Sequence, residues 1–141
     1  MNAGIDPRGP RFTAAITSAV LAAALVWPIG PELAAVQGVL FLMGVVLGVQ
    51  RTPTGVLFRT LVRPRLSPPE ELEDPRPPRF AQGVGLAFML VATAGFALGL
   101  DTLALVAIGM ALVAALLNAA VGLCLGCEMY LAGLRVARRP A

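Results

Sequence analysis

The sequence predicts an all-α integral membrane protein with four transmembrane helices, arranged as two tandem hairpins in a single membrane domain. Of its 141 residues, 57% are hydrophobic and only 13% are charged, whereas a soluble domain carries about 25% charged residues. The apolar residues gather in four long runs, and no arginine lies inside any of them. A soluble domain of this length has too little interior for so much apolar side chain, so we expect lipid to surround it.

The first hairpin is predicted from two apolar runs with helix-breaking residues between them. Phe12 to Trp27 forms the first run, and Leu33 to Val49 forms the second. Pro28, Gly30 and Pro31 lie between the runs, and a proline interrupts a helix because it has no N–H and its ring clashes with the preceding turn. Each run is close to the lower limit of the about 17 to 25 residues that span a bilayer. We therefore expect two antiparallel helices joined by a tight turn.

The second hairpin is predicted in the same way from the C-terminal half. Its runs extend from Phe80 to Leu100 and from Thr102 to about Leu125, and they meet around Asp101. Both runs are long enough to span a bilayer. The connection is too short for anything but another tight turn between antiparallel helices.

Between the hairpins, residues 54–63 are predicted to form a short amphipathic helix on the cytoplasmic membrane surface. Arg59 and Arg63 lie on one side of this helix. The other side is apolar and carries Leu57, Phe58, Leu61 and Val62. A helix with such opposed faces lies in the plane of the interface. Residues 66–73 are rich in proline and glutamate and cannot bury enough apolar surface to fold alone, so we expect an exposed linker there.

The placement of charge predicts the orientation. All eleven basic residues are arginines, and the chain has no histidine. The arginines lie in both tails and in the middle of the chain, whereas the expected hairpin tips carry only Glu32 and Asp101. Because basic residues stay on the cytoplasmic side, we expect both termini and the central loop in the cytoplasm of a bacterial inner membrane. The net charge of +3 reflects this topology, and we expect no nucleic-acid partner.

A short motif occurs twice and predicts an internal duplication. Asp-Pro-Arg-Gly-Pro-Arg-Phe at residues 6–12 recurs as Asp-Pro-Arg-Pro-Pro-Arg-Phe at residues 74–80. We expect repeats over residues 6–65 and 74–139 that enter the membrane from the same side. A cleavable signal peptide, the alternative for the first run, would have no copy in mid-chain. The motif's arginines are expected to anchor the helix starts at the lipid headgroups: Arg8, Arg11, Arg76 and Arg79.

Cys124 and Cys127 are the only cysteines in the chain, and we expect them at the cytoplasmic end of the fourth helix. On a continuous helix, residues three apart share a face, so the two sulfurs can meet. Gly122 and Gly126 could also loosen the helix end there, so that the pair lies on a turn. Three interpretations are open: thiol chemistry as a redox or persulfide pair, two small residues in a helix interface, or half of a zinc site completed by a second copy. A helix C-terminus and the adjacent Glu128 both disfavour a thiolate, which argues against thiol chemistry.

Three amide side chains lie within the predicted spans: Gln37, Gln82 and Asn118. A lone amide in a membrane more often bridges two helices than binds a solute, but these three could also line a path between the hairpins. Four helices make a narrow bundle, so such a path would require a homo-oligomer. No ionisable side chain lies at mid-membrane in the predicted spans, which argues against ion-coupled transport.

Together with the repeated motif, two further stretches resemble the bacterial membrane family called domain of unknown function 4395. They are Val-Arg-Pro-Arg-Leu at residues 62–66 and Leu-Asn-Ala-Ala-Val-Gly-Leu-Cys-Leu-Gly-Cys-Glu at residues 117–128. Leu123 replaces an aromatic residue that the family typically has before the first cysteine. The resemblance implies a soluble thioredoxin-like or sulfurtransferase partner, because similar members tend to be encoded near such proteins. It carries over no established catalytic residue.

These observations lead to the hypothesis of a membrane component of thiol-redox or sulfur-transfer metabolism, with Cys124 and Cys127 as its candidate redox pair. We expect it to need no cofactor and no metal, and whether it is an enzyme stays open. The alternatives are a small oligomeric channel or transporter and a membrane scaffold for a soluble partner.

Overall fold

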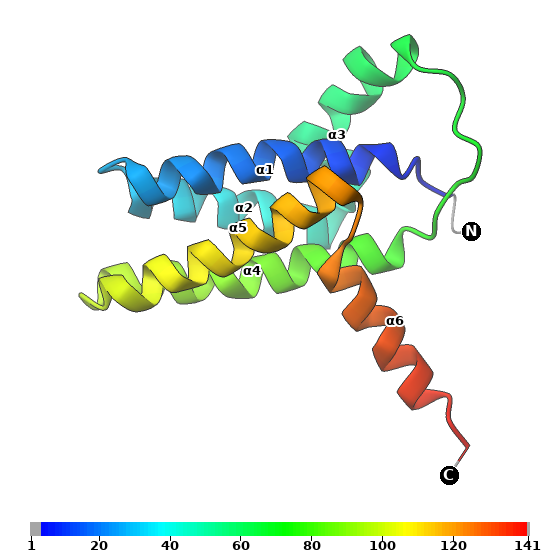
Figure 1. Cartoon of the computed structure of the whole chain (residues 1–141). Helices are drawn as coiled ribbons and strands as arrows, with labels where there is room; N and C mark the ends of the chain where they lie inside the picture. The colour runs from blue at the N-terminus through cyan, green and yellow to red at the C-terminus, as the bar shows by residue number, and fades with distance from the viewer. Residues whose placement is uncertain (1–3, 141) are drawn as a thin grey trace.

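The computed structural model describes residues 4–140 and consists of a bundle of long helices from which two shorter helical segments diverge (Figure 1). Four helices are long and apolar enough to cross a membrane: α1 (Arg8–Val26), α2 (Gly30–Leu47), α4 (Arg76–Ala97) and α5 (Asp101–Val121). The predicted all-α fold with four candidate spans is thereby confirmed. The chain is a multi-pass membrane protein by the length and composition of these helices.

The long helices form a bundle in which each packs against two neighbours. α1 lies between α2 and α5, and α4 also contacts α2 and α5. Leu21, Met89 and Ile108 are fully buried at its centre. The outward surface is apolar as well, since Leu90 is 62% exposed and Val106 is 53% exposed. Apolar side chains on the outside as well as the inside match a bundle that is solvated by lipid.

α1 and α4 both begin earlier than their apolar runs. α1 begins at Arg8 and not at Phe12, and α4 begins at Arg76 and not at Phe80. Pro7 and Pro75 are the N-cap residues of α1 and α4. The later prolines of the motif lie within the first turn of each helix, where an N–H has no partner inside the helix in any case. The motif therefore contains both the cap and the first turn of each helix.

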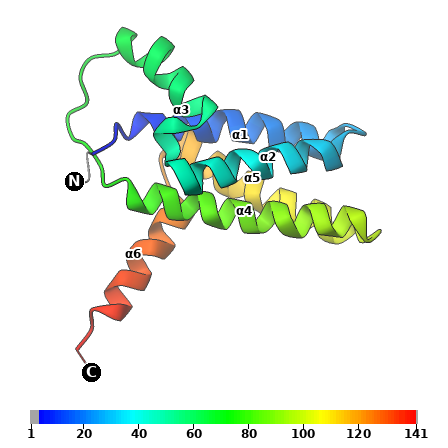
Figure 2. The same ribbon diagram turned by 180° about the vertical axis from the view of Figure 1, so that it is seen from behind.

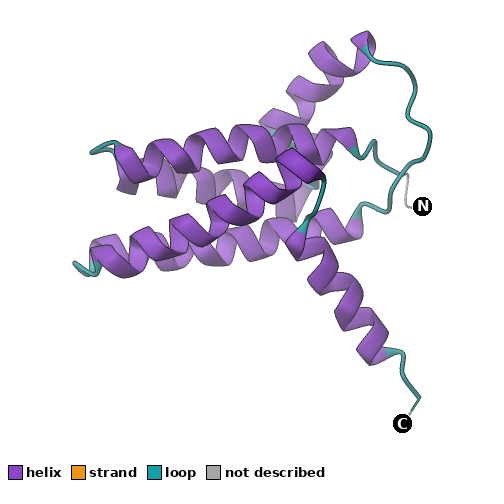
Figure 3. Ribbon diagram, viewed as in Figure 1, coloured by secondary structure: helices purple, strands orange, loops and turns teal. Residues whose placement is uncertain are grey.

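The segment between the hairpins is helical, as predicted, but irregular. After η1 (Val49–Arg51), the chain forms α3 (Pro53–Leu57), continues as the π-helical turn η2 (Phe58–Val62) and ends as the 3₁₀ turn η3 (Arg63–Arg65). Phe58 is buried and its ring lies 5.8 Å from that of Phe12 on α1. The loop that follows is largely exposed and is the long connection in Figure 3.

The predicted extent of the fourth helix is wrong. α5 ends at Val121, because Gly122 adopts a left-handed conformation with φ of 73° and its N–H closes onto the carbonyl of Asn118 at 3.0 Å. Glycine adopts this conformation without the steric cost of a side chain, which makes it a common helix terminator. The chain then begins a new helix, α6 (Leu125–Ala137).

α6 and the α3 segment leave the bundle at the same end and in different directions. Figures 1 and 2 show both diverging from the end where the two chain termini lie. The opposite end holds only the short connections of α1 to α2 and of α4 to α5. The cysteine pair therefore lies at the end of the bundle that carries α3, α6 and the long loop.

Candidate functional site

The cysteine pair forms the first turn of α6. Cys124 occupies the N-cap position, and its Sγ accepts a hydrogen bond from the backbone N–H of Cys127 at 3.3 Å. The two sulfurs are joined as a disulfide, and the Cα atoms are 5.2 Å apart, within the range of about 4.4 to 6.8 Å that disulfides require. Both cysteines are partly accessible. The prediction that this pair ends the fourth helix is therefore wrong, since it begins the next one.

This change of position reverses the expected electrostatics. The first N–H groups of a helix have no partner within it and carry a partial positive charge. A cysteine at such a helix start is favoured as a thiolate, which is the nucleophilic and metal-binding form. Glu128 also lies in the first turn of α6 and acts in the opposite direction. The helix dipole therefore no longer argues against a thiolate at Cys124, whereas the negative charge of Glu128 still does.

The start of α6 is held tightly against α4. A Cβ atom added to Gly126 would lie 2.6 Å from both the Cα and the Cβ of Ala81, so only glycine fits between the two helices at this contact. Further along, the rings of Phe80 and Tyr130 pack with their centroids 5.6 Å apart. The cysteine pair is thus fixed to the bundle although the rest of α6 diverges from it.

A cavity of about 240 Å³ lies among the helices and reaches Cys124. Residues at the start of α6 line it together with Cys124, and these are Leu125, Gly126 and Met129. The rest of the lining comes from α1, α2, α4 and α5 and is mostly apolar, including Phe41, Phe88 and Met110. No local pattern in the sequence joins the five helices that line this cavity.

Two of the three predicted amides line this cavity. Gln82 on α4 and Asn118 on α5 both contribute to its wall. Gln37 does not, since it lines a separate space of about 10 Å³ that Gln82 also borders. Gln37 is only 2% exposed, and within residues 4–140 its Oε1 has no hydrogen-bond partner. The structure therefore brings Gln82 and Asn118 to one cavity and leaves Gln37 beside it.

The four predicted anchor arginines all have partners within the chain. Arg8 pairs with Asp6 at 2.7 Å, and Arg76 pairs with Asp74 at 2.6 Å. Their hydrogen bonds hold the pKa of each aspartate below its ordinary value, and Arg63 adds to this effect at Asp6. These residues stabilise the chain where α1 and α4 begin.

The other two arginines bind the C-terminal ends of neighbouring helices. Arg11 donates to the carbonyls of Ala119 and Ala120 at 3.2 and 3.3 Å, near the end of α5. Arg79 donates to the carbonyls of Val45 and, at 2.9 Å, Val46 near the end of α2. The last carbonyls of a helix have no partner within it, and a cation there is also favoured by the helix dipole.

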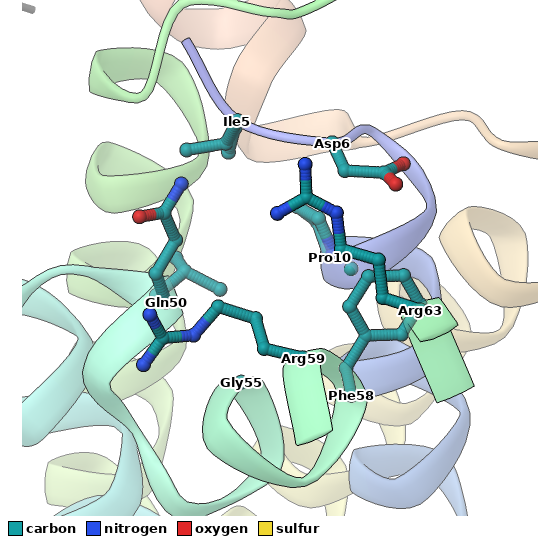
Figure 4. Close-up of a pocket in the computed structure, with 10 residues that line it drawn as sticks. Ile5, Asp6, Pro10, Gln50, Gly55, Phe58, Arg59 and Arg63 are labelled. Atoms are coloured by element: carbon teal, nitrogen blue, oxygen red, sulfur yellow. The ribbon is translucent and has the colours of Figure 1, made fainter. Parts of the chain in front are cut away.

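A second hollow lies beside α3 and is shown in Figure 4. Arg59 and Arg63 line it together with Asp6 and Gln50. Its volume is about 30 Å³, which is about the share of one water molecule in the liquid. This hollow is too small to hold a substrate.

Metal binding has no support from side-chain clustering. Over the described residues 4–140, no group of three or more histidine, cysteine, aspartate or glutamate side chains is placed to hold a metal ion. Two thiolates alone supply half of the four ligands of a structural zinc site.

Comparison with protein families gives one match. Residues 5–135 match the family described as Domain of unknown function (DUF4395). The chain belongs to this family. The match covers all four candidate spans, the cysteine pair and most of α6. Neither the curated proteins nor the solved structures contain a match to the chain.

Proposed function

We propose that this DUF4395 protein is a membrane component of thiol-redox or sulfur-transfer metabolism and that Cys124 and Cys127 are its reactive pair. The observation that carries the proposal is the position of Cys124 at the N-cap of α6, with its sulfur accepting the N–H of Cys127. A thiolate at that place receives the hydrogen bond and the favourable end of the helix dipole. The second cysteine is close enough to bond to the first.

The hydrogen bond distinguishes the two cysteines. Cys124 is the nucleophile, because its sulfur accepts the N–H of Cys127 and lies at the partly accessible helix start. It attacks a disulfide of a soluble partner, forms a mixed disulfide and releases one partner thiolate. Cys127 then attacks the sulfur of Cys124, which forms the internal disulfide and releases the second partner thiolate. Two electrons pass to the partner, and the reverse sequence returns them.

Sulfur transfer uses the same pair. A sulfurtransferase persulfide gives its outer sulfur to the Cys124 thiolate, which leaves the partner's thiolate and a persulfide on Cys124. Cys127 then attacks the inner sulfur, forms the disulfide and releases hydrosulfide. A thioredoxin-like or sulfurtransferase partner fits either course.

We also infer that the two halves of the chain are copies of one hairpin unit. Corresponding contacts support this inference. The pair Phe12–Phe58 has an interplanar angle of 43°, and the pair Phe80–Tyr130 has one of 48°. The backbone bridge between Ile5 and Glu73 joins the two residues that directly precede the two copies of the motif, through two bonds of 2.9 Å.

The repeat gives the cysteine pair a structural counterpart. In the first half, the hydroxyl of Thr52 accepts the N–H of Gly55 at 3.1 Å and caps α3. In the second half, Cys124 accepts the N–H of Cys127 in the corresponding turn. A hydroxyl is sufficient for a helix cap. Two cysteines in place of threonine and glycine therefore add chemistry that a cap does not need.

The orientation proposed for the chain places this pair at the cytoplasmic surface. The arginine-rich tails and loop lie at the same end of the bundle as α6, which supports cytoplasmic termini under the positive-inside rule. Disulfides in the cytoplasm are typically transient and catalytic. A pair that cycles between two thiols and one disulfide is consistent with a cytoplasmic position and with the disulfide between Cys124 and Cys127.

Thiol exchange with a soluble partner tests the proposal. The full-length protein in lipid nanodiscs is incubated with oxidised thioredoxin, and its cysteines are then alkylated and analysed by mass spectrometry. We expect the thiols of the reduced protein to become an internal disulfide while thioredoxin gains free thiols. The same sample with both cysteines replaced by serine should leave thioredoxin oxidised. The reverse reaction, with oxidised protein and reduced thioredoxin, is measured in the same way, because the relative potentials decide the direction of exchange. The proposal would be overturned if the wild-type cysteines exchanged with thioredoxin in neither direction and also stayed fully alkylatable with a persulfidated sulfurtransferase.

A second candidate function is an oligomeric channel or transporter. The observation that favours it is the presence of Gln82 and Asn118 on the wall of one intramembrane cavity. Solute flux into liposomes that contain the protein, reduced by Gln82→Leu, would support it. A monomer in both detergent and lipid, with no flux of small polar solutes, would exclude it.

A further inference from the structure

We propose that the cavity beside Cys124 binds the ring of a membrane quinone, which accepts the two electrons of the reduced cysteine pair. This inference rests on the proposed thiol function and adds its membrane substrate. Cys124 is part of the cavity wall, so a bound ring is next to the reactive sulfur. The cavity lies among helices that span the bilayer, where a lipid-soluble ligand enters without passing through water.

The cavity offers space and an apolar lining for the ring of such a ligand. Its volume of about 240 Å³ is below the about 300 to 1,000 Å³ of pockets that enclose a whole drug-sized molecule, so the proposed occupant is the ring alone. Aromatic and thioether side chains provide a flat, apolar lining: Phe41, Phe88, Met110 and Met129. Ligand sites combine such a lining with a few polar groups that orient the ligand.

Two amides supply those polar groups. Gln82 and Asn118 both border the cavity, on α4 and α5 respectively. The amide oxygen of Gln82 lies beside Gly44 of α2, so the NH₂ group of this amide is the one proposed to face the ligand. Among the residues that the structure describes, neither amide has a side-chain hydrogen bond to another residue. An amide N–H₂ donates to a carbonyl oxygen, and a quinone presents two carbonyl oxygens on opposite sides of its ring. A lipid acyl chain would fill the apolar part of the cavity but would leave both amides without a partner.

The electron balance selects the same class of ligand. Oxidation of the two thiols to a disulfide releases two electrons and two protons. A quinone takes up two electrons and two protons and becomes a quinol. Thioredoxin-type dithiols have potentials of about −270 mV, and quinones accept electrons at higher potentials. The transfer from cytoplasmic thiols through the pair to a quinone is therefore favourable.

The reaction balances in two steps at the cavity. The Cys124 thiolate adds to a ring carbon of the quinone, forming a sulfur–carbon bond and placing negative charge on a ring oxygen. Cys127 then attacks the Cys124 sulfur, which forms the disulfide and breaks the sulfur–carbon bond. The bonding electrons stay on the ring, and the two protons lost by the thiols complete the quinol.

The test uses reduced full-length protein in nanodiscs with decylubiquinone or, separately, a short-chain menaquinone. Both rings are fully substituted, so thiols do not become permanently attached to them. Quinol formation is followed by absorbance in a single turnover, and disulfide formation is followed by alkylation and mass spectrometry. We expect one quinol for each cysteine pair oxidised, with at least one of the two quinones.

A cavity-filling variant and a matched control identify the site. Ala115 lines the cavity, and Ala115→Phe places a ring in it. Ala94 is exposed on the outside of α4, so Ala94→Phe adds the same ring on the lipid-facing surface. We expect Ala115→Phe to slow quinol formation by about tenfold or more, as expected for steric loss of a site. Thioredoxin exchange in the same variant should change less than about twofold, and Ala94→Phe should behave as the wild type.

The outcomes separate the two proposals. Normal thioredoxin exchange without quinol formation overturns the quinone site and leaves the thiol function standing. Equal slowing by Ala115→Phe and Ala94→Phe, or a phospholipid that stays bound in native mass spectra and is displaced only by Ala115→Phe, also overturns it. Absence of thioredoxin exchange, of sulfur transfer from a persulfidated sulfurtransferase and of quinol formation overturns the thiol function itself.

Discussion

The sulfur of Cys124 lies 3.3 Å from the backbone nitrogen of Cys127 and accepts its N–H at the first turn of α6. This relationship makes Cys124 a helix cap, and under the proposed function the same position activates it as the nucleophile. It also makes the two cysteines unequal, although they are separated by only two residues.

The two single-cysteine variants should differ in whether they form a stable covalent complex with thioredoxin. Cys127→Ser leaves the nucleophile but removes the residue that resolves the mixed disulfide. We expect this variant to accumulate a covalent complex with thioredoxin on a non-reducing gel, whereas Cys124→Ser forms little or none. The reverse pattern would show that Cys127 is the nucleophile and that the cap does not activate Cys124.

Gly126 should be intolerant of any side chain. Its missing Cβ would lie 2.6 Å from the backbone Cα of Ala81, and backbone atoms do not move aside as a flexible side chain does. We expect Gly126→Ala to lower the free energy of unfolding by about 1 to 3 kcal/mol through overpacking. Thermal unfolding in detergent measures this change.

Gly133 provides the control within the same helix. A Cβ there would have no atom within 4 Å, and alanine favours a helix over glycine by about 1 kcal/mol. Gly133→Ala should therefore leave stability unchanged or raise it slightly. Similar losses for both variants would mean that α6 does not pack on α4 through Gly126.

Arg79 should stabilise the end of α2. Its guanidinium binds the carbonyls of Val45 and Val46, which have no partners further along the helix. We expect Arg79→Leu to lower the free energy of unfolding by about 1.5 to 3 kcal/mol, the range for a hydrogen bond that involves a charged group. Arg139→Leu in the C-terminal tail is the control, and an equal effect of the two changes on thermal unfolding would contradict a capping role.

The ion pair of Asp6 with Arg8 predicts a dependence of stability on pH. The hydrogen bonds of Arg8 lower the pKa of Asp6 in the folded state. The stabilisation is therefore fully present above the unfolded pKa of about 3.9 and is lost as the pH falls through the lower folded pKa. Asp6→Asn should be less stable than the wild type at pH 7, and the difference should shrink below about pH 4. A difference that stays constant from neutral to acidic pH would rule out this linkage.

The four long helices were predictable from the sequence, because hydropathy averaged over many residues identifies a span whatever its exact ends. The residue at which α5 ends was not predictable in this way. The apolar run continues from Val121 through Leu125, and hydropathy does not register the left-handed turn that Gly122 makes within it. The misplaced boundary put the cysteines at the wrong end of a helix and so reversed the inferred effect of the dipole.

The candidate site was predictable only in part. The spacing of Cys124 and Cys127 predicted that their sulfurs could meet, and they do. Gln82 and Asn118 were identified as polar residues in the spans, but their shared cavity depends on how α4 and α5 pack with α1. The amphipathic pattern predicted the short helix at residues 54–63, but not the π-helical turn within it. Packing between distant segments determines the shared cavity, and no local sequence pattern records it.

An equilibrium redox titration of the cysteine pair tests the thiol function most directly. The full-length protein in nanodiscs is equilibrated in buffers of defined thiol and disulfide ratio, and the alkylated fraction is measured by mass spectrometry. We expect a reversible two-electron transition in which Cys124 and Cys127 change together from two thiols to one internal disulfide. The proposed function would be contradicted if both cysteines stayed reduced at every ratio, or if an oxidised form could not be returned to thiols.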